Sequence, residues 1–155
     1  MEQSPVLEHP WDVSPEEAIE IQEQLAEQVS ERPLAQSVET IAGLDVSVRD
    51  DRVQAAAAVV EVDSGAVRSS AVWRGPVEFP YVPGLLSFRE MPALLPLLER
   101  LDGSPDVFMT DSHGRAHPRR FGLACHLGVY FDVPVVGVAK SRLVGTYEEP
   151  GLEKG

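Results

Sequence analysis

Three strand-like segments follow one another with only short turns between them, which limits the chain to a small set of folds. The segments read SVETIAGLDVSVR, RVQAAAAVVEVD and AVRSSAVW, and the breaks are Asp50–Asp51 and Asp63–Gly65. Turns this short join neighbouring antiparallel strands. The middle segment is apolar on both faces from Ala55 to Val60, which predicts a sheet covered on both sides. Its four alanines also suit a helix, but the flanking turns and valines favour a strand.

The remainder of the chain alternates between helical and strand patterns. SFREMPALLPLLERL predicts a helix in which Pro92 lies in the first turn and Pro96 causes a kink or a late start. DVFMTD predicts a short strand, PRRFGLACHLGVYF a helix and PVVGVAK a further buried strand. A meander followed by strand–helix–strand units predicts a mixed α/β fold, with a mixed sheet of five or more strands flanked by helices.

An acidic helix precedes the strands. In SPEEAIEIQEQLAEQVS, Ser14 is the expected N-cap, Pro15 takes the first helical position and Glu17 completes a capping box. Apolar residues recur at helical spacing, so we expect an amphipathic surface helix. A chain of 155 residues suits one domain, in which residues 1–36 form the helical N-terminal region and residues 37–155 the core.

The net charge of −12 argues against a non-specific nucleic-acid-binding protein, which is normally basic. The acids are unevenly placed, however. Between Arg89 and Arg142 seven basic residues stand beside six acidic ones, so the sequence is compatible with a local surface for a polyanion. No apolar run is long enough to cross a membrane, and the N-terminus lacks a signal pattern. Together with the single Cys125, these features predict a cytoplasmic protein without disulfides.

Three carboxylates lie where carboxylates are uncommon. Asp45 falls within the first strand, Asp111 ends a later strand, and Glu90 lies where an apolar loop becomes a helix. Together they predict a site for a divalent cation, since magnesium prefers carboxylate oxygens and commonly adds few protein ligands to a phosphate. Each also has an ordinary explanation: Asp45 as a solvated strand residue, Glu90 as a helix-start acid and Asp111 as a turn cap.

A proline-rich loop precedes Glu90. The stretch FPYVPGLLSFRE holds Tyr81 between Pro80 and Pro83 and continues with Gly84. One interpretation is a stiff loop that presents an aromatic ring to a ligand. The other is a buried turn in which Tyr81 packs with its hydroxyl group satisfied. The loop by itself leaves both open.

The segments GLDVS, PYVPGLLSFRE and TDSHGRAHPRRFGLACHLGVYFDVPVVGVAKSRLVG resemble successive signature segments of the endonuclease V family, over roughly Ser37 to Gly145. The resemblance implies a ribonuclease H-like fold. It also implies a magnesium-dependent endodeoxyribonuclease, with manganese as the alternative metal, that acts in DNA repair. Such an enzyme recognises deoxyinosine, the product of adenine deamination, and nicks the second phosphodiester bond 3′ of the lesion. An inosine-directed ribonuclease and a non-catalytic inosine-binding fragment are the alternatives.

The resemblance also assigns roles to single residues. Asp45, Glu90 and Asp111 correspond to the metal-binding and catalytic acids. Lys140 corresponds to a catalytic residue near the scissile phosphate, and His117 and Arg119 are expected to bind phosphate with it. The DNA wedge and base pocket correspond to Pro80, Tyr81, Val82, Pro83, Gly84 and Leu86. The expected partner is DNA containing deoxyinosine, with inosine-containing RNA as the alternative and no membrane, and we expect a monomer.

Two features depart from the family pattern. Ser112 stands where relatives commonly have glycine, so we expect its side chain to narrow the base pocket or restrict the turn and thereby to affect lesion preference. Family members also continue for tens of residues beyond VAKSRLVG. We therefore expect the core to be incomplete at its C-terminus and less stable than the full-length fold. Cys125 and His126 fall in the middle of a helix and are expected to pack.

Overall fold

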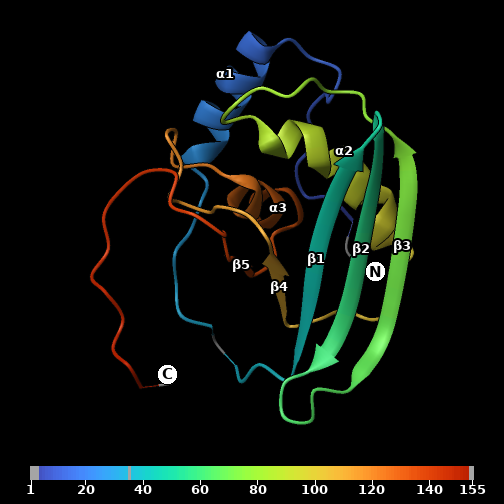
Figure 1. The fold of residues 1–155 in the computed structure, drawn as a ribbon, viewed down its shortest axis with the longest axis vertical. Coiled ribbons are helices and arrows are strands. Elements are labelled where there is room, and N and C mark those ends of the chain that lie inside the picture. The colour runs from blue at the N-terminus through green and yellow to red at the C-terminus, as the bar shows by residue number, and fades with distance from the viewer. Residues whose placement is uncertain (1–3, 35, 154–155) are drawn as a thin grey trace.

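A five-stranded mixed sheet forms the centre of the computed structural model, which describes residues 4–34 and 36–153. The strand order is β3-β2-β1-β4-β5 (Figure 1), in which β1, β2 and β3 form an antiparallel meander and β4 and β5 run parallel to β1. The predicted mixed α/β fold is therefore confirmed. The elements are α1 (Pro15–Ala26), β1 (Thr40–Arg49), β2 (Arg52–Glu61), β3 (Val67–Pro76), α2 (Leu86–Glu99), β4 (Val107–Thr110), α3 (Leu123–Phe131) and β5 (Val135–Gly137).

The predicted ranges 1–36 and 37–155 include residues 1–3, 35 and 154–155, which lie outside the described residues. Within the described ranges, no helix is both long enough and apolar enough to cross a membrane.

The turn between β1 and β2 is built by two aspartates. Asp50 and Asp51 have φ values of 50° and 55°, and a two-residue hairpin turn of type I′ requires positive φ at both central residues. Arg49 and Arg52 are paired directly across this turn. The hairpin fixes β2 as a strand, so the alternative of a helix at the alanine run is wrong.

Helices α2 and α3 pack on one face of the sheet (Figure 1), and α1 packs on α3. Every second residue of β2 from Val53 to Val59 is buried against these helices, whereas Ala56, Ala58 and Val60 are only partly buried. The prediction that the sheet is covered on both faces is thus wrong for the described part of the chain. Alanine explains the error, because its side chain is apolar yet exposes little surface when it faces water.

The helix starts follow the local capping groups. Ser14 and Glu17 form the predicted capping box at α1. Helix α3 begins at Leu123, later than the pattern predicted, because Arg120 has a φ of 56° and the extended Gly122 is the N-cap. Residues with these backbone angles cannot continue a helix.

Helix α2 begins at Leu86, so Pro92 lies in its interior and not in its first turn as predicted. Pro96 is also inside the helix, and each proline removes one backbone hydrogen bond. The helix is stable despite both prolines because one side is deeply buried. Phe88, Met91 and Leu94 on that side are each 0% exposed.

A pair of histidines fastens the N-terminal segment to α3. Nε2 of His9 lies 2.7 Å from Nε2 of His126, and Nδ1 of His9 lies 2.9 Å from the Pro10 carbonyl. If His9 donates from Nδ1, its Nε2 accepts a hydrogen bond from His126. The buried Nδ1 of His126 then lacks a proton, and it has no hydrogen-bond partner among the described residues. His126 and Cys125 are buried as predicted, although the partner His9 was not foreseen.

We expect this pair to weaken folding in mild acid. Burial lowers the pKa of His9 and holds that of His126 well below the usual value of 6.5, so the unfolded chain takes up protons that the folded chain does not. The stabilisation is complete above pH 6.5 and is lost as the pH falls below it. At pH 5.5 the loss is about 1.4 kcal/mol for a His126 that stays neutral, and the half-buried His9 adds less because solvent screens its charge. Denaturant unfolding at pH 7.5 and 5.5 measures it.

The variant His126→Phe provides the control for this prediction. Glu90 acts in the opposite direction, because burial raises its pKa to about 7 and stabilises the folded chain as the pH falls. The difference between wild type and variant separates the histidines from Glu90. The rings packed around the pair are those of Trp11, Phe88, Phe121 and Tyr130. Equal losses of unfolding free energy in both proteins would contradict the prediction.

Candidate functional site

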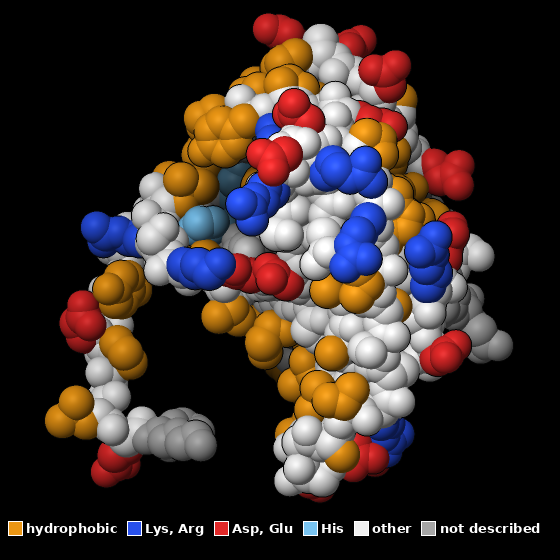
Figure 2. Space-filling model, turned by 45° about the vertical axis from the view of Figure 1, so that its right-hand side comes forward, with side chains coloured by type: hydrophobic (Ala, Val, Ile, Leu, Met, Phe, Trp, Pro, Cys, Tyr) orange, Lys and Arg blue, Asp and Glu red, His pale blue; other side chains and the backbone are white. Residues whose placement is uncertain are grey.

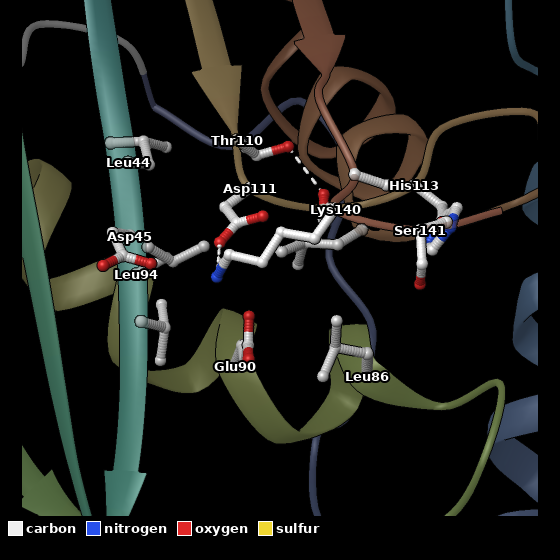
Figure 3. A pocket seen from close by; sticks show the side chains of 14 residues that line it. Leu44, Asp45, Leu86, Glu90, Leu94, Thr110, Asp111, His113, Lys140 and Ser141 are labelled. Atoms are coloured by element: carbon white, nitrogen blue, oxygen red, sulfur yellow. Dashed lines mark hydrogen bonds and ion pairs between the residues drawn. The ribbon is translucent and has the colours of Figure 1, made fainter. Parts of the chain in front are cut away.

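The end of β4 opens a gap in the sheet, and the three predicted acids surround it. Strand β4 pairs with β1 only from Ile41 to Leu44, and Leu44 is opposite Thr110. Asp45 on β1 and Asp111, the first residue after β4, therefore follow this pair on neighbouring segments. Beyond this point β1 has no β4 partner, and α2 supplies Glu90 to the gap from below (Figure 3). The three acids therefore line one pocket, as the sequence predicted.

The pocket between the acids has a volume of about 280 Å³. Lys140 completes its charged wall and forms an ion pair with Asp111 (Figure 3). Its hydrogen bond to Asp111 raises the pKa of Lys140. Apolar side chains form the remaining walls, among them Leu44, Leu86 and Leu94. Glu90 is partly removed from water here, and a charge in such surroundings interacts more strongly with a ligand charge.

Glu90 is the most perturbed acid of the pocket. Burial is the main reason that its pKa rises to about 7, and the negative charges of Asp45 and Asp111 raise it further. Arg89 and Lys140 act in the opposite direction but do not offset these effects. At Glu90, the negative charges of Asp45 and Asp111 therefore outweigh the positive charges of Arg89 and Lys140.

The chemistry of this donor set fits a hard divalent cation. Among the described residues, no group of three or more His, Cys, Asp and Glu side chains is gathered closely enough to bind one ion. Asp45, Glu90 and Asp111 instead line a shared hollow, with Asp111 turned to Lys140. Magnesium commonly retains several waters and uses one or two carboxylates together with phosphate oxygens. Carboxylates spread around a hollow suit this mode of binding.

The proline-rich loop presents its aromatic ring to solvent. The side chain of Tyr81 is 74% exposed, so the alternative of a packed tyrosine is wrong. The Arg89 guanidinium carbon lies 5.9 Å from the centre of the Tyr81 ring, within the range of a cation–π contact. Phe79, two residues earlier, is buried and anchors the start of the loop. The loop therefore has a fixed base and an accessible tip.

A second pocket of about 200 Å³ lies beside this loop. The predicted residues Tyr81, Val82, Pro83, Gly84 and Leu86 line it, but Pro80 does not. Three residues line both this pocket and the acidic one, so the two hollows adjoin: Leu86, His113 and Leu123. His113 also connects the two pockets through a hydrogen bond. Its Nε2 lies 2.8 Å from the carbonyl oxygen of Ser141, the residue after Lys140.

His117 and Arg119, predicted to bind phosphate, both contact the loop carbonyl of Gly84. The distances are 3.0 Å from Nε2 of His117 and 2.8 Å from Nη2 of Arg119. The other ring nitrogen of His117 accepts a hydrogen bond from the Arg119 amide at 3.2 Å, and the side chain is buried. Burial also lowers the pKa of His117. Phosphate binding by His117 remains a prediction, and this geometry leaves neither ring nitrogen free for it.

Gln22 belongs to the same hydrogen-bond network and was not identified from the sequence. It is 1% exposed on α1, and its amide nitrogen lies 3.1 Å from the Gly84 carbonyl. The signal was present, since Gln22 falls on the buried side of α1 between Ala18 and Leu25. A buried glutamine must find polar partners, and this one finds them far along the chain.

Ser112 is accommodated without entering the loop pocket. Its side chain is 3% exposed, and its hydroxyl group lies 2.6 Å from that of Thr110. Ser112 is absent from the described residues with positive φ, so the turn accepts a side chain. It lines the acidic pocket and not the pocket beside Tyr81. The expected narrowing of the base pocket is therefore not found, and an effect on lesion preference remains a prediction.

Basic side chains form a local group on the open face of the sheet. Arg49 and Arg52 are paired across the β1–β2 turn, and Arg74 is paired with Gln54 on the same face. All three arginines are exposed. Figure 2 shows Lys and Arg side chains across the middle of one face, with acidic side chains above and among them. A chain with a net charge of −12 can thus still offer positive surface to a polyanion.

Comparison with known proteins assigns the family. The family model described as Endonuclease V matches residues 23–155. The endonuclease V of Trichormus variabilis is 46% identical over 151 residues, which make up 95% of this chain and 68% of that protein. The chain belongs to the endonuclease V family.

Solved structures agree with this assignment. The endonuclease V of Streptomyces avermitilis superposes with a TM-score of 0.86 at 42% identity, over 94% of this chain and 65% of that one. The endonuclease V of Ciona intestinalis, solved with a 24mer DNA containing an inosine followed by a ribo-adenosine, gives 0.73 at 27% identity, over 81% of this chain and 57% of that one. The ribonuclease H-like fold is thereby confirmed. The chain spans about two thirds of the length of the relatives it matches.

Proposed function

We propose that this chain carries the catalytic acids and the lesion-recognition loop of a metal-dependent endonuclease. Its substrate is DNA containing deoxyinosine, which it nicks at the second phosphodiester bond 3′ of the lesion, in DNA repair. One observation carries the proposal: the acidic pocket adjoins the pocket beside the exposed Tyr81, through the shared residues Leu86, His113 and Leu123. Family membership and the inosine-containing DNA bound by the Ciona protein support the choice of substrate.

Recognition begins with the removal of the base from the helical stack, because an enzyme reads a lesion base only after extrusion. Tyr81 enters the gap and stacks on the neighbouring base, which offsets part of the energy lost on unstacking. The extruded base occupies the pocket lined by Val82, Gly84 and Leu86. Gly84, with a φ of 82°, shapes this wall, since a Cβ there would lie 2.8 Å from Nη2 of Arg119.

Cleavage takes place in the acidic pocket, where Asp45, Glu90 and Asp111 would hold Mg²⁺, or Mn²⁺ as the alternative. The cation supplies Lewis acidity that favours deprotonation of water and stabilises charge on the leaving oxygen. Lys140, whose side chain is 86% exposed, would present a point charge to the phosphate beside these acids. The pocket thus positions the phosphate bond next to the recognised base.

The proposed function is tested with a nicking assay on an oligonucleotide that contains one deoxyinosine, with Mg²⁺ and then Mn²⁺. A matched oligonucleotide with deoxyadenosine is the control. Metal-dependent nicking at the second bond 3′ of deoxyinosine alone is expected. Binding without nicking would favour a non-catalytic module, and a requirement for ribose at the cleavage site would favour an inosine-directed ribonuclease. The monomeric state and the cytoplasmic location remain predictions.

Metal binding should also raise the unfolding temperature. A ligand that binds only the folded state stabilises it by about 1.4 kcal/mol at ten times its Kd, or roughly 3–6 °C for a domain of this size. Thermal unfolding with and without Mg²⁺ at pH 8, where Glu90 is mostly ionised, measures the shift. Asp111→Asn should reduce it, whereas Asp63→Asn, in an exposed turn, should not. Equal shifts in the two variants would contradict the predicted metal site.

A further inference from the structure

A buried glutamine of α1 connects the N-terminal helix to the loop that carries Tyr81. Gln22 is 62 positions from Gly84 in the chain, yet its side-chain amide donates to the Gly84 carbonyl at 3.1 Å. Its side-chain oxygen accepts a hydrogen bond from Nε of Arg119 at 2.7 Å. Gln22 is thus joined to both the loop and the segment that contains His117 and Arg119.

Three side chains converge on the Gly84 carbonyl. Nη2 of Arg119 and Nε2 of His117 approach the same oxygen as Gln22, at 2.8 Å and 3.0 Å. A carbonyl oxygen has two lone pairs and can be satisfied by two donors. The third donor therefore exceeds what the hydrogen bonding of this oxygen needs. The convergence fixes the plane of the peptide that joins Gly84 to Leu85. The Leu85 amide closes the turn by donating to the Val82 carbonyl at 3.0 Å.

The location of this network distinguishes it from ordinary packing. An apolar side chain would fill the buried side of α1 without the energetic cost of burying an amide. Gln22 and His117 instead line the pocket beside Tyr81, together with Gly84 itself. A hydrogen bond to a guanidinium is among the stronger ones in proteins. The network therefore restrains the wall of the pocket and the base of the exposed loop.

We propose that Gln22 is a positioning residue for lesion recognition. With Arg119 and His117 it presets the loop from Tyr81 to Gly84, so that less conformational freedom is lost when Tyr81 inserts and the base enters the pocket. This inference rests on the proposed function and adds to it a recognition role for α1. It predicts that substrate binding depends on Gln22 while the chemistry at the acids does not.

The first test follows the free protein and needs no substrate. Gln22→Met keeps the length of the side chain but removes its hydrogen bonds, including those to Gly84 and Arg119. Gln24→Met changes an exposed residue of the same helix. Amide hydrogen exchange at Leu85 should become about tenfold faster in Gln22→Met and stay unchanged in Gln24→Met. Unchanged exchange at Leu85 in Gln22→Met would overturn the proposal, whatever the activity.

The second test uses the deoxyinosine oligonucleotide under nicking conditions. Gln22→Met should raise KM about tenfold and leave kcat nearly unchanged, because the acids are intact. Gln22→Glu keeps the acceptor for Arg119 but has no donor for the Gly84 carbonyl, so it should not recover the loss. A purely structural role would instead lower the active fraction, and so kcat, at constant KM, which would overturn the recognition role. Absence of nicking and binding in the wild type would refute the proposed function and this recognition role with it, while the exchange result would still decide whether Gln22 positions the loop.

Discussion

Asp45→Asn is expected to lower the rate of deoxyinosine-dependent nicking at least about 100-fold. Loss of a group that merely orients a metal ligand costs 10–100-fold in activity, so loss of a ligand should cost more. Asparagine keeps the shape of the side chain but removes the charge that attracts the cation. The neighbouring Asp111 and Glu90 cannot replace it, because they approach the pocket from β4 and α2. Single-turnover nicking at saturating Mg²⁺ measures the effect.

The stability of the same variant separates a catalytic role from a structural one. Asp45 is exposed on the open face of β1, so its replacement removes no buried contact. It also removes a negative charge that raises the pKa of Glu90, and relief of this repulsion should keep the metal-free unfolding temperature equal or raise it. Asp63→Asn is the matched control for nicking. Wild-type activity in Asp45→Asn, or loss of activity that follows a loss of folding, would count against the assignment.

The acids could be located from the sequence because strand geometry restricts them. A carboxylate inside a strand and another at the end of a parallel strand are unusual, and a mixed sheet brings such positions together. Leu44 opposite Thr110 sets the register that makes Asp45 and Asp111 neighbours. Local rules were sufficient here, since capping, hairpin turns and alternation all act over a few residues. The meander and the α1 cap were predictable for the same reason.

The Gly84 network could not be predicted, because it depends on contacts between distant segments. Gln22, Gly84 and Arg119 lie on three separate stretches of the chain. The basic character of His117 and Arg119 suggests phosphate contacts when each is considered alone. Burial changes this interpretation for His117, since a buried donor must be paired within the protein. The uncovered face of β2 has a similar cause, because apolar residues indicate what a strand tolerates and not what packs on it.

Tyr81→Ala is expected to weaken binding of deoxyinosine DNA about 5- to 150-fold. Stacking of a base on an aromatic side chain contributes ~1–3 kcal/mol, and each 1.4 kcal/mol corresponds to about a tenfold change in Kd. Tyr81 is 74% exposed and makes its one described ring contact with Arg89. The substitution should therefore leave the unfolding temperature nearly unchanged. Fluorescence titration of a labelled oligonucleotide without a catalytic metal measures the affinity.

Tyr81→Phe is the matched variant, because it keeps the ring and removes only the hydroxyl group. If stacking is the main contribution, Phe should bind within about threefold of wild type, whereas Ala should show the full loss. The loss should be larger for deoxyinosine than for an undamaged duplex, since only the extruded base leaves a gap for the ring to fill. Equal affinity of Tyr81→Ala and wild type would remove the wedge from the mechanism. The pocket beside Gly84 would then have to recognise the lesion without the exposed ring, which would shift the discrimination between bases to the loop that Gln22 holds in place.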